Sequence, residues 1–205
     1  MKLVLATRNA HKRRELSRLM PEYELEELGD AIALPPEEGE TFEENALAKA
    51  RAVTLATGRP AIGEDSGIEA AALGGAPGVR SARYASTAGA NSSDEENLAK
   101  LRREAPVDSG LRYVCALAYA DSGSGVEHLF LGYCTGRLAG EERGERGFGY
   151  DPVFVPDEGP DERTFAELSD AEKDAISHRG NAARALAEWL AASSELPAGE
   201  AARSG

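Results

Sequence analysis

The sequence predicts a mixed α/β fold with two lobes around a cleft, and two patterns support this prediction. In the first half of the chain, short apolar segments typical of strands alternate with amphipathic segments typical of helices. In the second half, two longer strand-like segments, 111–120 and 126–138, flank the turn sequence DSGSG and predict a hairpin. We expect residues 1–193 to form one domain and 194–205 a flexible tail, because the chain contains neither a repeat nor a linker-like segment before that tail.

The first half opens with a short apolar strand, followed by a helix that Asn9 caps. A loop rich in proline, glycine and glutamate separates the second strand from the second helix. The third strand is expected to run into a turn at EDSG before a further short strand begins. The expected strands lie at 2–7, 23–28, 60–67 and 68–73, the helices at 10–20 and 42–57, and the loop at 29–41.

Capping boxes mark two helix starts in the second half, because Ser93 and Ser169 each stand three residues before a glutamate. The first box predicts a helix over 94–104. The glycine-rich segment 143–156 is expected to run from a loop into a strand, and a last helix is predicted over 178–192.

The composition, 41% hydrophobic and 29% charged over 205 residues, is typical of a globular protein. It excludes a collagen-like, disulfide-scaffold or wholly disordered chain. No apolar run approaches the ~20 residues that span a bilayer, and the N-terminal apolar segment is too short for a signal peptide, so we expect a cytoplasmic protein. Cys115 and Cys134 lie in apolar runs and are expected to be buried, reduced thiols.

The formal net charge of −13 restricts the possible partners. Duplex nucleic acid is disfavoured, because a duplex binder normally needs a basic face for its phosphate contacts. A polyphosphate would require a local basic pocket, or a divalent cation held by acidic side chains. Three of the few lysines, Lys12, Lys49 and Lys173, lie in segments with other candidate functional residues.

The junction between the first strand and the first helix is a candidate phosphate site, because free N–H groups at a helix start attract anions and Lys12 adds a full charge. The alternative is a capped surface helix whose lysine extends to solvent. Lys49 falls inside the apolar stripe of the next helix, so it needs either a buried partner or a route to the rim.

Adjacent carboxylates are expected at the end of the strand 60–67, where α/β sheets commonly bind ligands. Glu64 and Asp65, together with Glu37 or Glu38 of the acidic loop, could hold Mg²⁺, which prefers oxygen ligands. The alternative is an ordinary turn capped by an aspartate.

Two further segments contain candidate ligand contacts. In 147–152, glycines permit close backbone approach, aromatic rings can stack on a base, and Asp151 can accept hydrogen bonds from ring N–H groups. The alternative is a tight turn whose aromatic rings pack in the core. Lys173 and Arg179 reach one rim only if the helix breaks near 175–177, and otherwise they form a basic surface corner.

Five segments occur in order along about residues 2–190: LATRNAHKRREL, TFEENALAKA, EDSGIEAAALGGAPGVRSARYA, GFGYDPVFVP and TFAELSDAEKDAISHRGNAARAL. Together they resemble the non-canonical purine nucleoside triphosphate pyrophosphatases, also named dITP/XTP or inosine triphosphate pyrophosphatases. Each segment alone is modest, whereas five in order are very specific.

The resemblance implies an elongated mixed β-sheet with flanking helices, two lobes around a central cleft, and a homodimer. It also implies Mg²⁺-dependent hydrolysis of ITP, dITP and XTP to the monophosphate and pyrophosphate. By motif, Asp65 is the expected Mg²⁺ ligand or general base. The expected substrate contacts are Thr7, Arg8, Asn9, Ala10, His11, Lys12, Lys49, Ser66, Phe148, Gly149, Tyr150, Asp151, Lys173, His178 and Arg179.

One departure from the family pattern concerns the second metal ligand. The family often has a glutamate three residues before the loop glycine that corresponds to Gly39, and Pro36 stands at that position here. Glu37 is the expected substitute, with Glu38 or Glu64 as alternatives.

Base selectivity is expected to come from hydrogen-bond polarity. A pocket that donates to the 6-oxo group of hypoxanthine or xanthine leaves donors unpaired when adenine binds, and such sites can discriminate by roughly 10⁴-fold. His178 and Arg179 are candidate donors. The alternatives are a Maf-type nucleotide pyrophosphatase with another base preference, and a nucleotide sensor without turnover, which would gain nothing from carboxylates beside phosphate.

Overall fold

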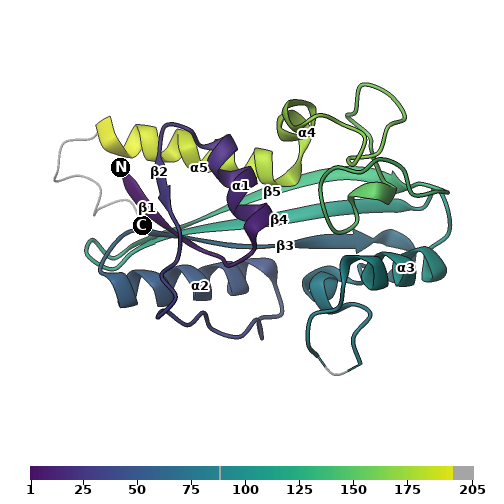
Figure 1. Cartoon of the computed structure of the whole chain (residues 1–205). Helices are drawn as coiled ribbons and strands as arrows, with labels where there is room; N and C mark the ends of the chain where they lie inside the picture. The colour runs from purple at the N-terminus through teal and green to yellow at the C-terminus, as the bar shows by residue number, and fades with distance from the viewer. Residues whose placement is uncertain (88, 196–205) are drawn as a thin grey trace.

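The computed structural model describes residues 1–87 and 89–195, which form a six-stranded mixed sheet with helices on both faces (Figure 1). The strand order is β2-β1-β3-β4-β5-β6. β1 pairs in parallel with β2 and β3, whereas the pairs from β3 to β6 are all antiparallel. The strands are Lys2–Ala6 (β1), Glu24–Glu26 (β2), Ala61–Ala70 (β3), Gly110–Asp121 (β4), Val126–Leu138 (β5) and Phe154–Pro156 (β6).

Helices α1, α4 and α5 lie on one face of the sheet, and α2 and α3 lie on the other (Figure 1). Three short 3₁₀ helices join the main elements. The helices are Ala10–Leu19 (α1), Phe42–Thr57 (α2), Asp94–Glu104 (α3), Asp170–Ile176 (α4) and His178–Glu195 (α5), and the 3₁₀ helices are Ala71–Leu73 (η1), Gly78–Arg83 (η2) and Asp151–Val153 (η3). The expected mixed α/β fold is therefore confirmed.

The local sequence signals for helix ends are also confirmed. Asn9 caps α1, and the boxes that begin at Ser93 and Ser169 cap α3 and α4. The expected hairpin is present as β4 and β5. The last helix reaches Glu195, two residues into the segment expected to be a tail, and the remainder of that segment lies outside the described residues.

Two glycines allow the helices to pack closely on the sheet. A Cβ on Gly63 of β3 would lie 2.0 Å from the carbonyl oxygen of Ala46 in α2. A Cβ on Gly132 of β5 would lie 2.0 Å from the carbonyl oxygen of His178 in α5. Real Cβ atoms do not approach so closely, so the close packing of α2 and α5 on the sheet requires glycine at both positions.

The prediction of two strands separated by a turn at 60–73 is wrong. Residues 61–70 form one continuous strand, and each of them pairs with β4. Glu64 and Asp65 therefore lie in the middle of β3 and not at the end of a strand. Glycines and acidic residues resemble a turn locally, but the long antiparallel ladder with β4 keeps this segment extended.

Unequal strand lengths create an open edge along β3. β1 pairs with β3 only at Ala61, Ile62 and Gly63, because β1 ends at Ala6. From Glu64 onwards, no strand of the described residues pairs with the edge of β3 that faces away from β4, until a bridge joins Glu69 to Pro77. The interrupted edge lies at the carboxyl end of β1, where α/β folds commonly place ligand sites.

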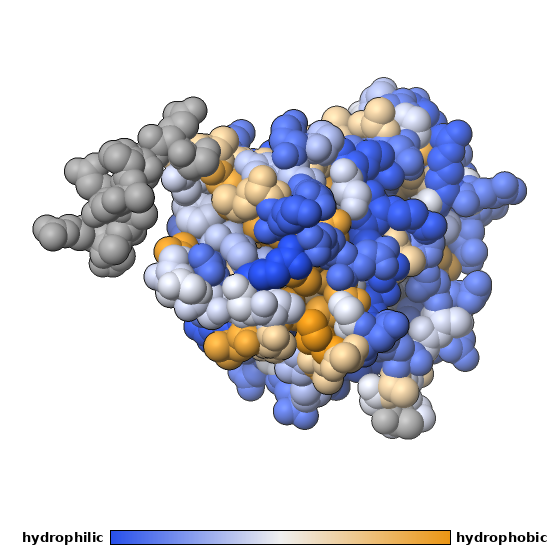
Figure 2. Space-filling view, turned by 60° about the vertical axis from the view of Figure 1, so that its left-hand side comes forward, coloured by the Kyte–Doolittle hydropathy of each residue, from blue (hydrophilic) through white to orange (hydrophobic). Residues whose placement is uncertain are grey.

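Along residues 1–87 and 89–195, we find no helix with the length and apolar content needed to cross a bilayer. In the view of Figure 2, hydrophilic residues cover most of the surface and hydrophobic ones form small, separate patches. The expected buried thiols are confirmed, because Cys115 and Cys134 are buried and free.

Candidate active site

A cavity of about 310 Å³ opens beside the interrupted edge of β3. Its walls come from the end of β1, the first turn of α1, the loop before α2, the middle of β3, η2, and the segments around η3, α4 and α5. Fifteen of the residues proposed from the sequence line it: Thr7, Arg8, Asn9, Lys12, Glu37, Lys49, Asp65, Ser66, Phe148, Gly149, Tyr150, Asp151, Lys173, His178 and Arg179.

Four of the proposed residues do not line the cavity within the described chain. Ala10 and His11 are exposed on α1, and the His11 ring stacks on Phe148 with centroids 5.0 Å apart. Glu38 is exposed, and Glu64 is buried behind the cavity wall. Their roles as ligand contacts remain predictions that the arrangement does not favour.

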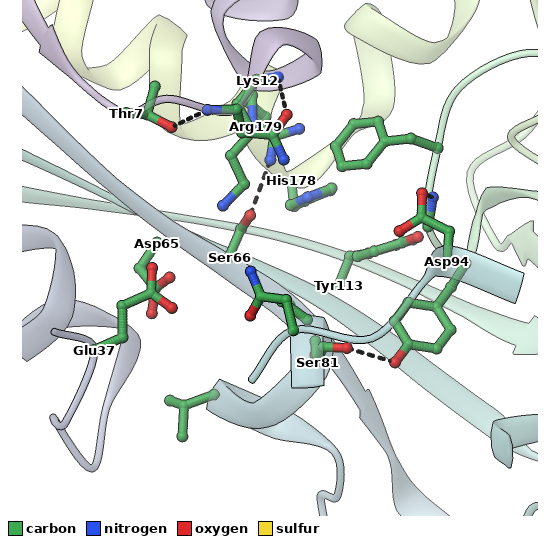
Figure 3. Close-up of a pocket in the computed structure, with 18 of the residues that line it drawn as sticks. Thr7, Lys12, Glu37, Asp65, Ser66, Ser81, Asp94, Tyr113, His178 and Arg179 are labelled. Atoms are coloured by element: carbon green, nitrogen blue, oxygen red, sulfur yellow. Dashed lines mark hydrogen bonds between the residues drawn. The ribbon is translucent and has the colours of Figure 1, made fainter. Parts of the chain in front are cut away.

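The start of α1 offers less to a phosphate than the sequence suggested. The Asn9 side chain already accepts hydrogen bonds from the N–H groups of His11 (2.9 Å) and Lys12 (3.2 Å). Thr7 Oγ1 accepts another from the Asn9 N–H. The attraction for an anion at this point therefore rests mainly on the ammonium of Lys12, which faces the cavity (Figure 3).

Asp65 lies at the centre of a buried hydrogen-bonded group. Asn45 Nδ2 donates to Asp65 Oδ2 at 2.9 Å, and Lys49 Nζ lies 3.2 Å from Oδ1. Lys49 also donates to the main-chain oxygen of Glu64 and forms an ion pair with Glu37. Burial raises the pKa of Asp65 above its ordinary value, with Lys49 and Lys12 opposing the shift. Figure 3 shows Asp65 and Glu37 side by side at one end of the cavity.

Lys49 and Glu37 each stabilise the ionised form of the other. Burial would lower the pKa of Lys49, but Asp65 and Glu37 raise it above its ordinary value, so this amine stays charged. Burial would raise the pKa of Glu37, but Lys49, Lys12 and Arg83 keep it below its ordinary value. The apolar stripe of α2 therefore carries a lysine that is fully partnered by acids.

A second buried network lies on the opposite side of β3. Arg179 Nη2 donates to Glu64 Oε1 and to Ser66 Oγ, each at 2.9 Å, and its Nη1 pairs with Glu15. Lys12 Nζ lies 2.6 Å from Glu64 Oε2. Burial would raise the pKa of Glu64, but Lys12 and Arg179 lower it, so this carboxylate stays ionised. Glu64 is thereby engaged by two cations and is poorly placed to bind a metal.

The expected helix break brings Lys173 and Arg179 together. α4 ends before Ser177, whose backbone is extended, and α5 begins at His178. Glu15 of α1 bridges the two cations, with Lys173 Nζ 2.9 Å from its Oε1. The sequence reasoning did not select Glu15. Its position three residues after Lys12 and beside Leu16, on the inward side of α1, was the available signal.

Asp151 already accepts three hydrogen bonds from protein donors, so its expected contact with a base stays a prediction that this arrangement does not favour. Its Oδ1 accepts from Tyr113 Oη at 3.0 Å, and its Oδ2 accepts from Lys173 Nζ at 2.7 Å and from the Phe148 N–H at 3.0 Å. Asp151 therefore holds Phe148 and Lys173 in place. Asp94, a lining residue not selected from the sequence, accepts from the Gly149 N–H at 2.7 Å.

Aromatic rings lie at the other end of the cavity from Asp65 and Glu37 (Figure 3). The His178 ring stacks on Tyr113 with centroids 4.5 Å apart and an interplanar angle of 5°. Burial, helped by Arg179, lowers the pKa of His178 well below its ordinary value, so the ring is neutral. Its buried Nδ1 has no hydrogen-bond partner among the described residues.

The remaining lining residues missed by the sequence reasoning come mostly from η2, α3 and the loops beside them. Such residues carry no local signal of function, because small and amide side chains are common in turns. They are Ala6, Leu34, Gly67, Val79, Ser81, Ala82, Asn91, Asn97 and Tyr113.

The residues present fit a divalent cation that takes some of its ligands from the protein and the others from substrate phosphates and water. Within residues 1–87 and 89–195, no group of three or more His, Cys, Asp or Glu side chains is arranged to hold a metal ion alone. Asp65 and Glu37 nevertheless approach the same ammonium group, so their carboxylates lie close together. Mg²⁺ commonly takes one or two carboxylates and completes its shell with water and substrate phosphates.

The structure is an open α/β sheet with a central cavity that combines lysines, paired carboxylates and stacked rings, an arrangement suited to a phosphorylated ligand. The sequence matches the model of the Ham1 family over residues 3–189, and the chain belongs to this family.

Relatives of known name and structure agree with this assignment. The chain is 47% identical to a dITP/XTP pyrophosphatase of Mycobacterium tuberculosis H37Rv, over 97% of this chain and 98% of the relative. It is similar to the solved Ham1 protein of Staphylococcus aureus, with a TM-score of 0.81 and 34% identity over 94% of this chain and 100% of that one. It also resembles a nucleoside-triphosphatase / dITP/XTP pyrophosphatase from Mycobacterium abscessus, with a TM-score of 0.70 and 42% identity over 93% and 99% of the two chains.

Proposed function

We propose that this protein is a nucleoside triphosphate pyrophosphatase that hydrolyses non-canonical purine nucleotides, dITP, ITP and XTP, to the monophosphate and pyrophosphate. The observation that carries the proposal is that the carboxylates of Asp65 and Glu37 both contact Lys49, inside the same cavity as Lys12. The names of the relatives support the same reaction and substrate class.

The phosphates bind at the cationic part of the cavity. Lys12 and Lys49 reach it from the two opposite faces of the sheet, and Lys173 lies on its wall. Asp151 and Glu15 raise the pKa of Lys173 against the opposing effect of burial, so this amine also stays charged. These few amines give an acidic chain a local binding site for a highly anionic ligand.

Asp65 and Glu37 are the proposed ligands of Mg²⁺. The geometry favours Glu37 over Glu38, which is exposed, and over Glu64, which is held by Lys12 and Arg179. When bound, Mg²⁺ supplies positive charge that polarises the phosphoryl oxygens and stabilises the charge developing on them.

The chain's own residues then orient the reaction. A water attacks the α-phosphorus, the bond from this atom to the bridging oxygen breaks, and pyrophosphate leaves. Asp65 acts here in one of two ways: as the general base it accepts the proton of the attacking water, and as a ligand of Mg²⁺ it positions the metal. Lys12 and Lys49 stabilise the charge that accumulates on the phosphates.

The purine ring binds at the aromatic end of the cavity, near Phe148 and His178. The proposed polar contacts for the base are His178 Nδ1 and Arg179 Nε, two buried atoms without a hydrogen-bond partner in the part of the chain that the structure describes. Arg179 always donates, which suits a 6-oxo acceptor and leaves a mismatch with the 6-amino group of adenine.

Pyrophosphate release tests the proposal. ITP, dITP and XTP should be hydrolysed in the presence of Mg²⁺ at a kcat/KM at least about 100-fold above that for ATP, and EDTA should abolish the activity. Equal rates for ITP and ATP would contradict the base preference. Preferred hydrolysis of dTTP or UTP would indicate a Maf-type specificity, and tight ITP binding without pyrophosphate release would indicate a sensor.

We further propose that the protein is a cytoplasmic homodimer. Leu129, Leu131 and Tyr133 form an apolar stripe along one face of β5, and each is roughly 40% exposed. A second copy of this chain is the proposed occupant, since a stripe on a strand can pack against its own image across a two-fold axis.

A further inference from the structure

The loop from Gly29 to Thr41 carries Glu37 to the cavity but contains no helix or strand of its own. Ile32 and Leu34 of the loop pack against the core, and side chains from outside the loop also hold its path. Arg8 Nη2 donates to the main-chain oxygen of Ile32 at 2.8 Å, and Asn45 Oδ1 accepts from the Gly39 N–H at 2.8 Å. Neither contact touches Glu37 itself.

Arg83 makes the contacts that involve Glu37 directly. Its Nη2 donates to the main-chain oxygen of Glu37 at 3.0 Å, and its Nη1 lies 3.5 Å from Glu37 Oε2. The other carboxylate oxygen, Oε1, pairs with Lys49. One cation on each oxygen fixes the plane of the carboxylate, whereas Lys49 alone would leave it free to turn about the ion pair.

The main chain that carries Arg83 is itself held by hydrogen bonds. Arg83 closes η2, and Ser81 of the same 3₁₀ helix accepts from the Ile68 N–H at 2.9 Å. Tyr150 Oη donates to the main-chain oxygen of Ser81 at 2.8 Å. The Arg83 side chain is only 19% exposed. A guanidinium fixed in this way can hold a loop, because its planar fork loses little freedom for each hydrogen bond.

We propose that Arg83 is a positioning residue for Glu37: it holds the main chain and the carboxylate of this residue so that the carboxylate faces Asp65. It thereby sets the affinity of the Glu37–Asp65 pair for a divalent cation. The second part of this inference rests on the proposed function, whereas the first part concerns the loop alone. Arg83 does not line the cavity, so it acts through Glu37.

Hydrogen exchange of the loop tests the first part without any metal or nucleotide. In Arg83→Gln, the amides of residues 37–40 should exchange at least about 10-fold faster than in the wild type. Arg80→Gln is the matched control, because Arg80 is an exposed arginine of the same 3₁₀ helix that lines a different groove. Unchanged exchange in Arg83→Gln, or equal acceleration in Arg80→Gln, would overturn the proposal.

Binding of Mn²⁺ as a probe, followed by electron paramagnetic resonance, tests the second part. Arg83→Gln should weaken Mn²⁺ binding about 10-fold, as expected when a residue that orients a ligand is removed, and Arg83→Lys should restore part of the loss. In a Glu37→Gln background, Arg83→Gln should have no further effect. An equal loss in both backgrounds, or unchanged Mn²⁺ binding, would overturn this role.

Activity gives a separate measurement. Arg83→Gln should raise the Mg²⁺ concentration for half-maximal ITP hydrolysis by about 10-fold while kcat at saturating Mg²⁺ stays close to that of the wild type. Absence of ITP hydrolysis in the wild type would refute the proposed function, but the exchange and Mn²⁺ experiments would still decide the role of Arg83.

Discussion

Glu64 and Asp65 are neighbours in β3, yet their carboxylates lie on opposite faces of the sheet. Glu64 meets Lys12 and Arg179 on the side of α1 and α5, whereas Asp65 meets Lys49 and Asn45 on the side of α2. This follows from the two-residue period of a strand. The cavity opens where, among the residues that the structure describes, this stretch of β3 lacks a partner strand on one edge. Each acid is held by a buried cation, but only Asp65 lines the cavity.

Asp65→Asn tests the assignment of the central acid. Asparagine keeps the shape and can still accept one hydrogen bond, so the fold should be preserved, but it can neither accept a proton nor carry the charge that a cation requires. We expect kcat for ITP to fall by at least about 100-fold. An unfolding temperature close to that of the wild type would show that the loss is chemical, and near-normal turnover would refute the assignment.

Glu15 should make stability depend on acid pH. Burial opposes its ionisation, but Arg179 and Lys173 lower its pKa from 4.5 to about 2. Its contribution to the free energy of unfolding is therefore fully present above pH 4.5 and is lost as pH falls towards 2. This contribution amounts to roughly 3 kcal/mol.

Urea unfolding at several pH values measures this effect. Glu15→Gln should be less stable at pH 7 and should show a shallower loss of stability between pH 5 and about pH 2 than the wild type. Glu22→Gln, a change at an exposed position nearby in sequence, is the control. Parallel pH profiles for the wild type and Glu15→Gln would contradict the prediction.

The apolar stripe on β5 should control self-association. Leu131→Glu places a charge at its centre, and the desolvation cost of burying that charge against a second copy should shift the dimer towards monomer. Sedimentation velocity over a range of concentrations measures the change. Leu55→Glu is the matched control, because Leu55 is 76% exposed on α2. If Leu131→Glu associates as the wild type does, the stripe is not the interface.

Gly63→Ala tests the close packing of α2 on the sheet. Its new Cβ would meet the main chain of Ala46 and Ala50, which cannot move without displacing the helix that carries Lys49. We expect a loss of about 1–3 kcal/mol, which lowers the unfolding temperature of a chain of this size by roughly 2–4 °C per kcal/mol. Gly29→Ala, where a Cβ would meet nothing within 4 Å, should be nearly neutral in a thermal scan.

Sequence patterns predicted the locally determined parts of the fold well. The capping residues Asn9, Ser93 and Ser169 predicted helix starts, because the cap and the N–H groups that it accepts lie within one turn. The helix predicted over 178–192 begins at His178, and the break near 175–177, one of two alternatives left open, is present. These features depend on neighbours in the chain and need no knowledge of tertiary contacts.

The features that sequence patterns missed depend on distant partners. β3 continues through Glu64 and Asp65 because β4, some fifty residues later in the chain, pairs with it throughout. Glu15 lies close to Lys173 and Arg179 only in the folded molecule. Arg83 likewise meets Glu37 across 46 positions of the chain. No window of local sequence contains both members of such a pair.

The premature end of β1 has a consequence for how this scaffold can change. The cavity occupies the space that a longer β1 would fill. Its width along β3 is therefore set by the end of β1 and by the point at which Pro77 pairs with Glu69. Insertions or deletions at either boundary would enlarge or shrink the space for a ligand without disturbing the ladder between β3 and β4. Ligand size could therefore diverge among proteins of this architecture while their central hairpins stay superimposable.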